Sequence, residues 1–273
     1  MKRDLPPPST ASPPRRAGTD AAWKALHRAA SAIFYRPADR WPWFWARGKL
    51  GRDPVFRGLL ERGDLPAAAR VLDLGCGQGL IAALLHATEA LARQGRWPDA
   101  WPAAPSARAY TGVELMAKDA ARAQAALQGL TFGSGAAPRI VCADMRSAEL
   151  PPSDVVILLD VLHYVDHAAQ DALLLRVRQA LAASPGRGRL LLRVADATDR
   201  RRYAIGQWVD RVVTGVRGHA RPPTWGRPLA AWTALLQGLG FAVHAVPMSQ
   251  GTPFANVLLV ADLGPAPRAA STR

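Results

Sequence analysis

The 273-residue sequence has few cysteines, few lysines and no long hydrophobic run. Its two cysteines, Cys76 and Cys142, are too few for a disulfide framework or a thiolate zinc site, and no metal is expected. No apolar segment approaches the roughly 20 residues that a membrane-spanning helix needs, and Asp160 interrupts the best one, residues 155–162. The first residues also lack the continuous apolar core of a secretory signal. Together these features predict a cytoplasmic globular protein.

Acidic side chains are scarce relative to basic ones, 21 against 35, which gives a formal net charge of +14. Such a charge favours a polyanionic partner, which could be nucleic acid, anionic lipid or an acidic protein. Only four of the basic residues are lysines, however, and the chain is also rich in alanine, glycine and proline. A GC-rich coding sequence produces the same bias without any functional demand, so the charge alone assigns no partner.

Composition divides the chain into four stretches. Residues 1–19 are rich in proline, serine and arginine and predict a disordered tail, and residues 264–273 predict a second one. Residues 20–66 are aromatic and basic and predict a helical N-terminal lid. From residue 67 to residue 263, short apolar runs alternate with helical stretches. This alternation predicts right-handed crossovers and a parallel sheet.

Seven strand-like runs and four amphipathic helices are expected within this last stretch. The strands are expected at residues 70–74, 110–115, 139–143, 154–159, 189–194, 241–246 and 254–261, and the helices at residues 80–91, 117–127, 173–181 and 229–239. No helix fits between the last two strands, so a turn containing Gly251 and Pro253 must join them as an antiparallel pair. The predicted fold is a doubly wound α/β fold, with a mostly parallel seven-stranded sheet ending in an antiparallel hairpin.

The strongest motif is a Gly-x-Gly-x-Gly turn between a strand and a helix, in the segment Val71-Leu72-Asp73-Leu74-Gly75-Cys76-Gly77-Gln78-Gly79. Glycines permit a sharp turn and the close approach of a ligand, and the first N–H groups of the helix offer donors. A dinucleotide loop usually has its third glycine one residue later. Asp73 also places a negative charge where a pyrophosphate would be repelled, so the loop suits a cationic ligand.

This segment resembles the first motif of class I S-adenosylmethionine-dependent methyltransferases, and the resemblance extends over residues 66–263. It implies S-adenosylmethionine as cofactor, bound by the loop residues Asp73, Gly75, Cys76, Gly77 and Gly79. Within the loop, Cys76 is expected to be a small spacer and not a nucleophile.

The same resemblance assigns cofactor contacts at the ends of the next three strands. It implies that the adenosine and methionine parts of the cofactor contact Glu114, Leu115, Asp144, Met145, Asp160 and Val161. Glu114 would accept both ribose hydroxyls, and Asp144 would contact the adenine amine. The distance from Gly79 to Glu114 exceeds the ~20 residues usual before an acidic ribose ligand, which a surface insertion at residues 93–108 explains.

Methyl transfer from a sulfonium is an in-line displacement whose leaving group departs neutral, so holding the acceptor in place can supply roughly 7–11 kcal/mol. A base is needed only where the acceptor must lose a proton. His163 is the candidate, because Val161-Leu162-His163-Tyr164 resembles the Leu-His-Asp-Trp segment of small-molecule O-methyltransferases, where the histidine removes that proton. The alternative is a histidine bonded to the loop backbone. Tyr164 is a candidate substrate contact, and Asp166 is expected to begin a helix.

Three further segments are candidates for acceptor specificity. Residues 41–49 could form an aromatic lid with Trp43 against the acceptor, a hydrophobic anchor for the N-terminal helices, or a peripheral contact with a membrane. Residues 197–227 could form a basic cap or a solvated face. The turn between the last two strands could orient the acceptor through Ser249 and Asn256, or be a plain hairpin.

The sequence therefore predicts methyl transfer to a small-molecule or carrier-tethered acceptor. Residues 48–56 and the final hairpin also resemble methyltransferases that accompany bacterial aryl-polyene and fatty-acid-like synthases, which implies an aromatic or acyl-carrier-bound acceptor. Nucleic acid is disfavoured, because residues 160–163 read Asp-Val-Leu-His and not the Asn/Asp-Pro-Pro-aromatic run of base methylases, and no Pro-Cys nucleophile follows. The remaining alternatives are an RNA methyltransferase and a non-catalytic regulatory protein that binds S-adenosylmethionine.

Overall fold

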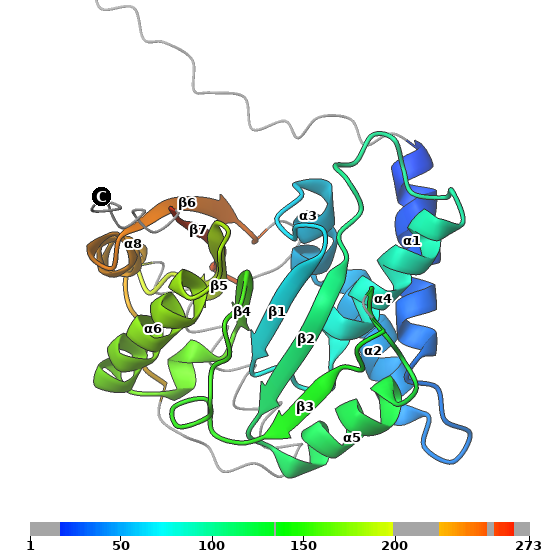
Figure 1. The fold of residues 1–273 in the computed structure, drawn as a ribbon, viewed down its shortest axis with the longest axis horizontal. Coiled ribbons are helices and arrows are strands. Elements are labelled where there is room, and N and C mark those ends of the chain that lie inside the picture. Colours follow the sequence, from blue (N-terminus) through cyan, green and yellow to red (C-terminus); the bar gives the residue numbers. More distant parts are fainter. Residues whose placement is uncertain (1–16, 134, 199–223, 250–253, 265–273) are drawn as a thin grey trace, which may run out of the picture.

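The structure is a computed structural model that describes residues 17–133, 135–198, 224–249 and 254–264 (Figure 1). Most of both expected tails, most of the expected basic cap and the tip of the last hairpin lie outside these residues. The strands are β1 (Ala69–Leu74), β2 (Ala107–Glu114), β3 (Arg139–Cys142), β4 (Val155–Leu159), β5 (Gly188–Ala195), β6 (Phe241–Pro247) and β7 (Asn256–Leu263). The helices are α1 (Ala17–Ala32), α2 (Trp41–Arg52), α3 (Pro54–Glu61), α4 (Leu80–Arg93), α5 (Ala117–Leu127), α6 (His167–Ala182) and α8 (Leu229–Gly238). None of these helices has the length and apolar composition needed to cross a membrane.

All seven strands form one sheet in the order β3-β2-β1-β4-β5-β7-β6. Strands β1 to β5 run parallel, and β7 lies antiparallel between β5 and β6. The predicted fold class is confirmed, including the antiparallel hairpin at the end. Strand β4 reads as a continuous aliphatic run because both of its faces are buried.

Helices cover both faces of the sheet, and loops follow the carboxyl ends of its parallel strands (Figure 1). Successive residues of a strand point to opposite faces. In β1, Val71 packs with the N-terminal helices and α4, whereas Leu72 and Leu74 pack with α6 and α8. The two faces of the sheet thus belong to two separate hydrophobic clusters.

The N-terminal helices belong to the same hydrophobic core as β1 and α4. Trp23, Leu26, Phe34 and Leu50 are buried there. Four apolar residues of α3 are buried in the same core: Val55, Phe56, Leu59 and Leu60. These side chains attach the N-terminal helices to the core. For residues 41–49, the buried side of α2, formed by Pro42, Ala46 and Leu50, agrees with the hydrophobic anchor, which was one of the three alternatives for that segment. Helix α1 also begins at Ala17, so the expected tail ends earlier than predicted.

The expected surface insertion is partly a core element. Helix α4 extends to Arg93 and β2 begins at Ala107, so the connecting loop is shorter than residues 93–108. Trp101 is only 8% exposed and joins the core under α4. Trp97 lies edge-on to it, with ring centroids 5.1 Å apart, and donates from Nε1 to the carbonyl of Pro102 at 2.8 Å. Most of the segment is nevertheless exposed, so Trp101 attaches a surface loop to the core.

Candidate functional site

The register of the parallel strands brings the predicted acidic residues to one edge of the sheet. Asp73 in β1 is opposite Gly112 in β2 and Ile157 in β4, and Glu114 and Asp160 follow within a few residues of these partners. Ligands of open α/β sheets bind outside such carboxyl ends. The structure therefore places Asp73, Glu114 and Asp160 at one edge of the sheet.

Two glycines of the loop, Gly75 and Gly77, differ in the space around them. Gly75 has φ 75°, its N–H donates to the carbonyl of Val113 at 2.8 Å, and a Cβ there would lie 2.4 Å from Val161 Cγ1. Gly77 has φ 56°, and a Cβ there would have nothing within 4 Å. Gly75 is therefore required by packing inside the protein, whereas Gly77 leaves space beside the loop.

We expect Gly75→Ala and Gly77→Ala to separate these two roles. Alanine at position 75 collides with Val161 and strains a left-handed backbone, so the melting temperature should fall by several degrees. Alanine at position 77 adds only the backbone strain, roughly 1–2 kcal/mol, but fills the open space. Its main effect should be at least tenfold weaker binding of S-adenosylhomocysteine, measured by calorimetry. Equal affinities for wild type and Gly77→Ala would show that no ligand approaches there.

Asp73 is a buried carboxylate for which the described residues provide no cation. It is 3% exposed and accepts one hydrogen bond from the hydroxyl of Tyr110, at 2.6 Å. Burial raises the pKa of Asp73 to about 7, the nearby Glu114 adds to this rise, and the Tyr110 hydrogen bond opposes it. A buried acid with this environment fits a cationic ligand.

Glu114 joins the glycine loop to the end of β2. Its carboxylate accepts the N–H of Gly77 at 2.9 Å and that of Met116 at 2.8 Å. The next side chain, Leu115, is 61% exposed, more than any other exposed large hydrophobic residue that the structure describes. A carboxylate such as Glu114 can accept hydrogen bonds from the hydroxyls of a ribose, and the exposed side chain of Leu115 can pack against a base. The pair therefore fits a nucleoside.

Cys76 lies between the loop glycines with its thiol against the backbone of β2. A Cβ at Gly112 would lie 2.7 Å from its Sγ. Burial raises the pKa of Cys76 well above its ordinary value, and neighbouring carboxylates raise it further. The thiol therefore stays protonated, which agrees with a spacer and not a nucleophile.

Asp144 and Met145 lie in the loop after β3. The Asp144 carboxylate pairs with Arg146, Nη2 to Oδ2 at 2.5 Å, and this hydrogen bond lowers the pKa of Asp144. Arg176 of α6 donates to the carbonyls of Met145 at 3.2 Å and Arg146 at 2.7 Å, which fixes the loop. The half-buried Met145 packs on the core under α6.

Asp160 follows β4 in a left-handed conformation, with φ 59°. Its carboxylate is bound by Arg193 of β5, with Nε 2.7 Å from Oδ1. Arg193 also binds Asp53, which pairs with Lys49. The motifs did not indicate these three partners. The only signal was that Arg193 interrupts the apolar run of residues 190–194 within β5, since a buried arginine needs a partner.

His163 lies in a 3₁₀ turn, Leu162–Tyr164, directly after this edge. Its carbonyl accepts the N–H of Trp225 at 2.8 Å, and its ring lies 4.0 Å from that of Tyr164, centroid to centroid. The fully buried Gln170 stabilises the turn. Its Nε2 lies 3.1, 3.0 and 2.8 Å from the carbonyl oxygens of Leu162, Val165 and Trp225, which share its two N–H groups. Gln170 is a second residue that the motifs did not indicate.

One face of α2 extends along the carboxyl edge. Trp41 and Trp45 stack with ring centroids 6.2 Å apart, Arg122 of α5 lies over Trp41 at 4.8 Å, and Lys49 Nζ lies 4.0 Å from Asp160 Oδ2. Trp43 points to the other flank, edge-on to the ring of Tyr35. Trp45 therefore shares the helix face of Trp41 and Lys49, whereas Trp43, the residue that the sequence suggested, lies on the other flank beside Tyr35.

The remaining expected contacts lie at the same edge. Asn256 begins β7 opposite Ala195, the last residue of β5. The carbonyl of Asn256 accepts the N–H of Met248 at 2.8 Å, which places Ser249 beside it. Residues 250–253 of this hairpin lie outside the described residues. Within the described chain, no group of three or more His, Cys, Asp or Glu side chains is arranged to hold a metal ion.

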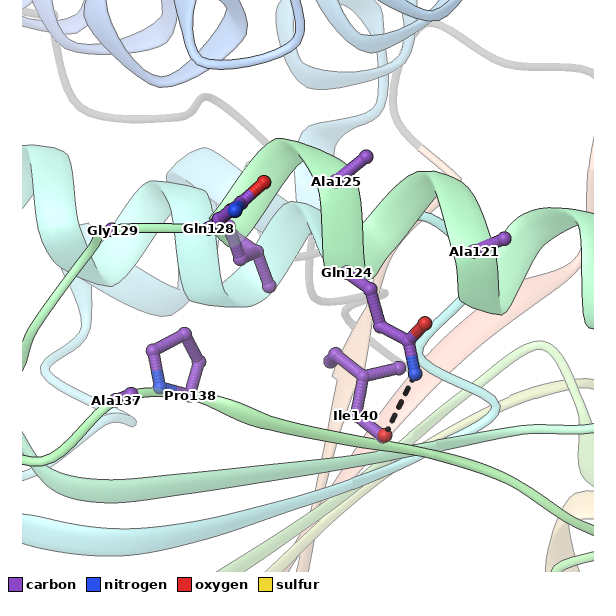
Figure 2. Close-up of a pocket in the computed structure, with 9 residues that line it drawn as sticks. Ala121, Gln124, Ala125, Gln128, Gly129, Ala137, Pro138 and Ile140 are labelled. Atoms are coloured by element: carbon purple, nitrogen blue, oxygen red, sulfur yellow. Dashed lines mark hydrogen bonds between the residues drawn. The ribbon is translucent and has the colours of Figure 1, made fainter.

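A groove of about 550 Å³ lies elsewhere, between α5 and the edge strand β3. Figure 2 shows Gln124 and Ala121 on the helix above Ile140 of β3 and Pro138, which directly precedes the strand; Gln124 Nε2 donates to the carbonyl of Ile140 at 3.3 Å. The groove is lined by no charged side chain and by none of the acids at the carboxyl edge. It is therefore not the site that the acids form.

The sequence matches the family described as "Methyltransferase domain" over residues 46–246. The chain belongs to this family. It is a class I methyltransferase that uses S-adenosylmethionine, and the fold and the edge of acids agree with the predicted resemblance. The matched region includes most of α2, the glycine loop, and strands β1 to β5, so it covers every residue predicted to contact the cofactor.

Solved structures with a similar fold are also methyltransferases. The methyltransferase is 21% identical to magnesium protoporphyrin IX methyltransferase from Synechocystis PCC 6803, with a TM-score of 0.50, covering 91% of this chain and 95% of that one. It is 20% identical to mitomycin 7-O-methyltransferase (TM-score 0.54, 90% and 68% covered) and 16% identical to an O-methyltransferase family protein from Burkholderia thailandensis (TM-score 0.55, 91% and 68% covered). At these identities the likeness shows the fold alone. No curated protein matches the sequence significantly.

Proposed function

We propose that this methyltransferase methylates a small or carrier-tethered aromatic acceptor that gives up a proton to His163. The observation that carries the proposal is the position of His163, in a turn that Gln170 stabilises at the carboxyl edge, beside Tyr164. The similar structures named O-methyltransferases support an acceptor of this kind. Histidine is the commonest side chain that removes protons in enzymes.

The chain's own residues would bind and orient the reactants. S-adenosylmethionine supplies an activated methyl group on a positively charged sulfur. Glu114 would hold its ribose, Leu115 and Met145 its adenine, and the buried Asp73 would favour its positive charge. The backbone around Asp160 and Val161 would border its methionine part, since the Asp160 carboxylate is occupied by Arg193.

Helix α2 would provide the wall against the acceptor. Trp41 and Trp45 offer flat apolar surface along the site, and stacked rings bind an aromatic acceptor with little loss of conformational freedom. Tyr164, Ser249 and Asn256 would supply polar contacts from the opposite loops. Proximity then accounts for much of the rate, because the acceptor is held against the methyl group.

We expect cofactor affinity to depend on the ionisation of Asp73. Because the pKa of Asp73 is about 7, its charged fraction rises about tenfold from pH 6 to pH 8, and the affinity for S-adenosylmethionine should rise by a similar factor. This pKa lies above the ordinary value, so Asp73 stabilises the ligand-free fold at low pH, and that contribution is lost as the pH rises through about 7. Calorimetry between pH 5.5 and 8.5 measures the affinity. Asp73→Asn should abolish the pH dependence; an unchanged profile in that variant contradicts the role of Asp73.

A labelling experiment tests the function. The purified protein is incubated with methyl-labelled S-adenosylmethionine and fractionated extract of the producing cells, and the products are identified by mass spectrometry. We expect one labelled small molecule or labelled carrier protein. Label in RNA, with binding that weakens steeply with salt, would support an RNA methyltransferase instead. Cofactor binding without any labelled product would support a regulatory protein.

A further inference from the structure

Four charged side chains join the N-terminal helices to the carboxyl edge of the sheet. Arg193 lies at the centre, with its side chain only 2% exposed. It donates to Asp160 on one side, Nε to Oδ1 at 2.7 Å, and to Asp53 on the other, through Nη1 at 2.5 Å and Nη2 at 2.8 Å. Lys49 Nζ completes the cluster at 2.7 Å from Asp53 and 4.0 Å from Asp160. Two cations thus face two carboxylates, and the cluster is neutral.

The two carboxylates keep the buried guanidinium charged. Burial opposes the charge on Arg193, but Asp160 and Asp53 raise the pKa of Arg193 above its ordinary value. Burial likewise opposes the charge on Asp53, but Arg193 and Lys49 lower the pKa of Asp53. Each member depends on the others, so the cluster has one arrangement, in which both sides of the guanidinium are occupied.

On one side, the cluster fixes the turn that borders the glycine loop. Asp160 has a left-handed backbone, and the next residue, Val161, packs directly over Gly75. A displacement of the glycine loop therefore acts on Val161 through direct contact and on Asp160 as the preceding residue. Close-packed protein interiors transmit such small displacements.

On the other side, the cluster fixes the junction of α2 and α3. Asp53 Oδ1 accepts the N–H of Val55 at 3.1 Å and so caps α3, and the backbone N–H of Asp53 donates to the carbonyl of Lys49 at 3.0 Å at the end of α2. Helix α2 carries Trp45 and Lys49 along the site. Its position over the edge therefore depends on Asp53, and Asp53 depends on Arg193.

We propose that Arg193 is a positioning residue that couples cofactor binding at the glycine loop to the ordering of helix α2. The proposal rests on the proposed function, in which α2 is the acceptor wall. A bound cofactor would fix the loop, and through Val161, Asp160 and Arg193 it would also fix Asp53 and α2. Cofactor binding would then make the wall against the acceptor more rigid.

Hydrogen exchange of backbone amides, with and without S-adenosylhomocysteine, tests the coupling. The segments compared are residues 74–80 in the loop and residues 42–52 in α2. In the wild type, the ligand should slow exchange in both segments. Asp53→Asn keeps a capping oxygen for α3 but removes the charge that Arg193 binds. In this variant, α2 should exchange at least tenfold faster, and the ligand should slow exchange only in the loop.

The control variant is Arg189→Met. Arg189 lies in the same strand and pairs with Asp262 at 2.7 Å, but at the opposite end of β5. In Arg189→Met, the ligand should slow hydrogen exchange in both segments, as it does in the wild type. If Asp53→Asn does not fold, Arg193→Lys takes its place, because an ammonium keeps the charge but cannot bind both carboxylates as a planar fork. The same loss of response in α2 is expected.

The outcomes distinguish coupling through Arg193 from a purely structural role of Arg193 and from a wrongly assigned cofactor site. A wild type in which the ligand protects the loop but not α2 overturns the coupling and leaves the cofactor site intact. The same conclusion follows if the ligand still protects α2 in the folded variant, even at a lower melting temperature, because Arg193 would then be merely structural. If the ligand protects neither segment of the wild type, the cofactor site itself is wrong, and the coupling fails with it.

Discussion

Glu114→Ala should weaken the binding of S-adenosylhomocysteine by at least about 100-fold. In the proposed function the carboxylate of Glu114 accepts two ribose hydroxyls. Hydrogen bonds to a charged group contribute about 1.5–3 kcal/mol each, so the loss of two would correspond to a factor of this size or more. It also holds the N–H groups of Gly77 and Met116, so its removal loosens the loop that the cofactor contacts. Calorimetry with the demethylated product measures the affinity without turnover.

Two further variants separate the charge from the fold. Glu114→Gln retains the shape and one acceptor oxygen, so it should lie between the wild type and Glu114→Ala. Glu149→Ala removes an exposed acid in the loop after β3 and should bind as the wild type does. An affinity of Glu114→Ala within threefold of the wild type would falsify the assignment of Glu114 to the ribose.

His163→Ala should lower the rate of methyl transfer by about 10²- to 10⁴-fold, the usual contribution of a positioned proton acceptor. The side chain lies beyond the acids of the cofactor site, so the affinity for S-adenosylhomocysteine should stay unchanged. Single-turnover kinetics with the acceptor identified by labelling measures the step directly. The split between rate and cofactor affinity distinguishes a proton acceptor from a residue that only maintains the loop.

The matched control is His167→Ala. This exposed histidine begins α6 four residues later, and its Nε2 lies 3.4 Å from the carbonyl of Gly226. Its removal should leave the rate close to that of the wild type. If His163→Ala keeps the wild-type rate, the acceptor loses its proton elsewhere, and proximity to the methyl donor accounts for the catalysis.

Local patterns were enough to predict the order of the elements. Buried strands read as continuous aliphatic runs, and α5 was predicted with the bounds it has, since helical periodicity is visible within a dozen residues. The antiparallel end of the sheet followed because no helix fits between residues 246 and 254. The glycine loop was also readable, because a crowded left-handed turn such as that at Gly75 admits only glycine.

The facing of α2 could not be predicted in this way. Tryptophans occur at every second position, 41, 43 and 45, so both flanks of the helix are aromatic. Its buried side is set by Pro42, Ala46 and Leu50, and only the packing of that side on the core decides which tryptophan faces the site. The partial burial of the 93–108 insertion was missed for the same reason, because the contact between its tryptophans is tertiary.

The sequence by itself determined the fold class, the glycine loop and the acids at the strand ends, because each depends on residues close together in the chain. Only the tertiary structure decided that the Asp160 carboxylate is bound by Arg193 and that Asp53, 140 residues before Arg193, binds its other side. Such an ion cluster depends on which buried charges meet when distant segments pack, and no local pattern records that.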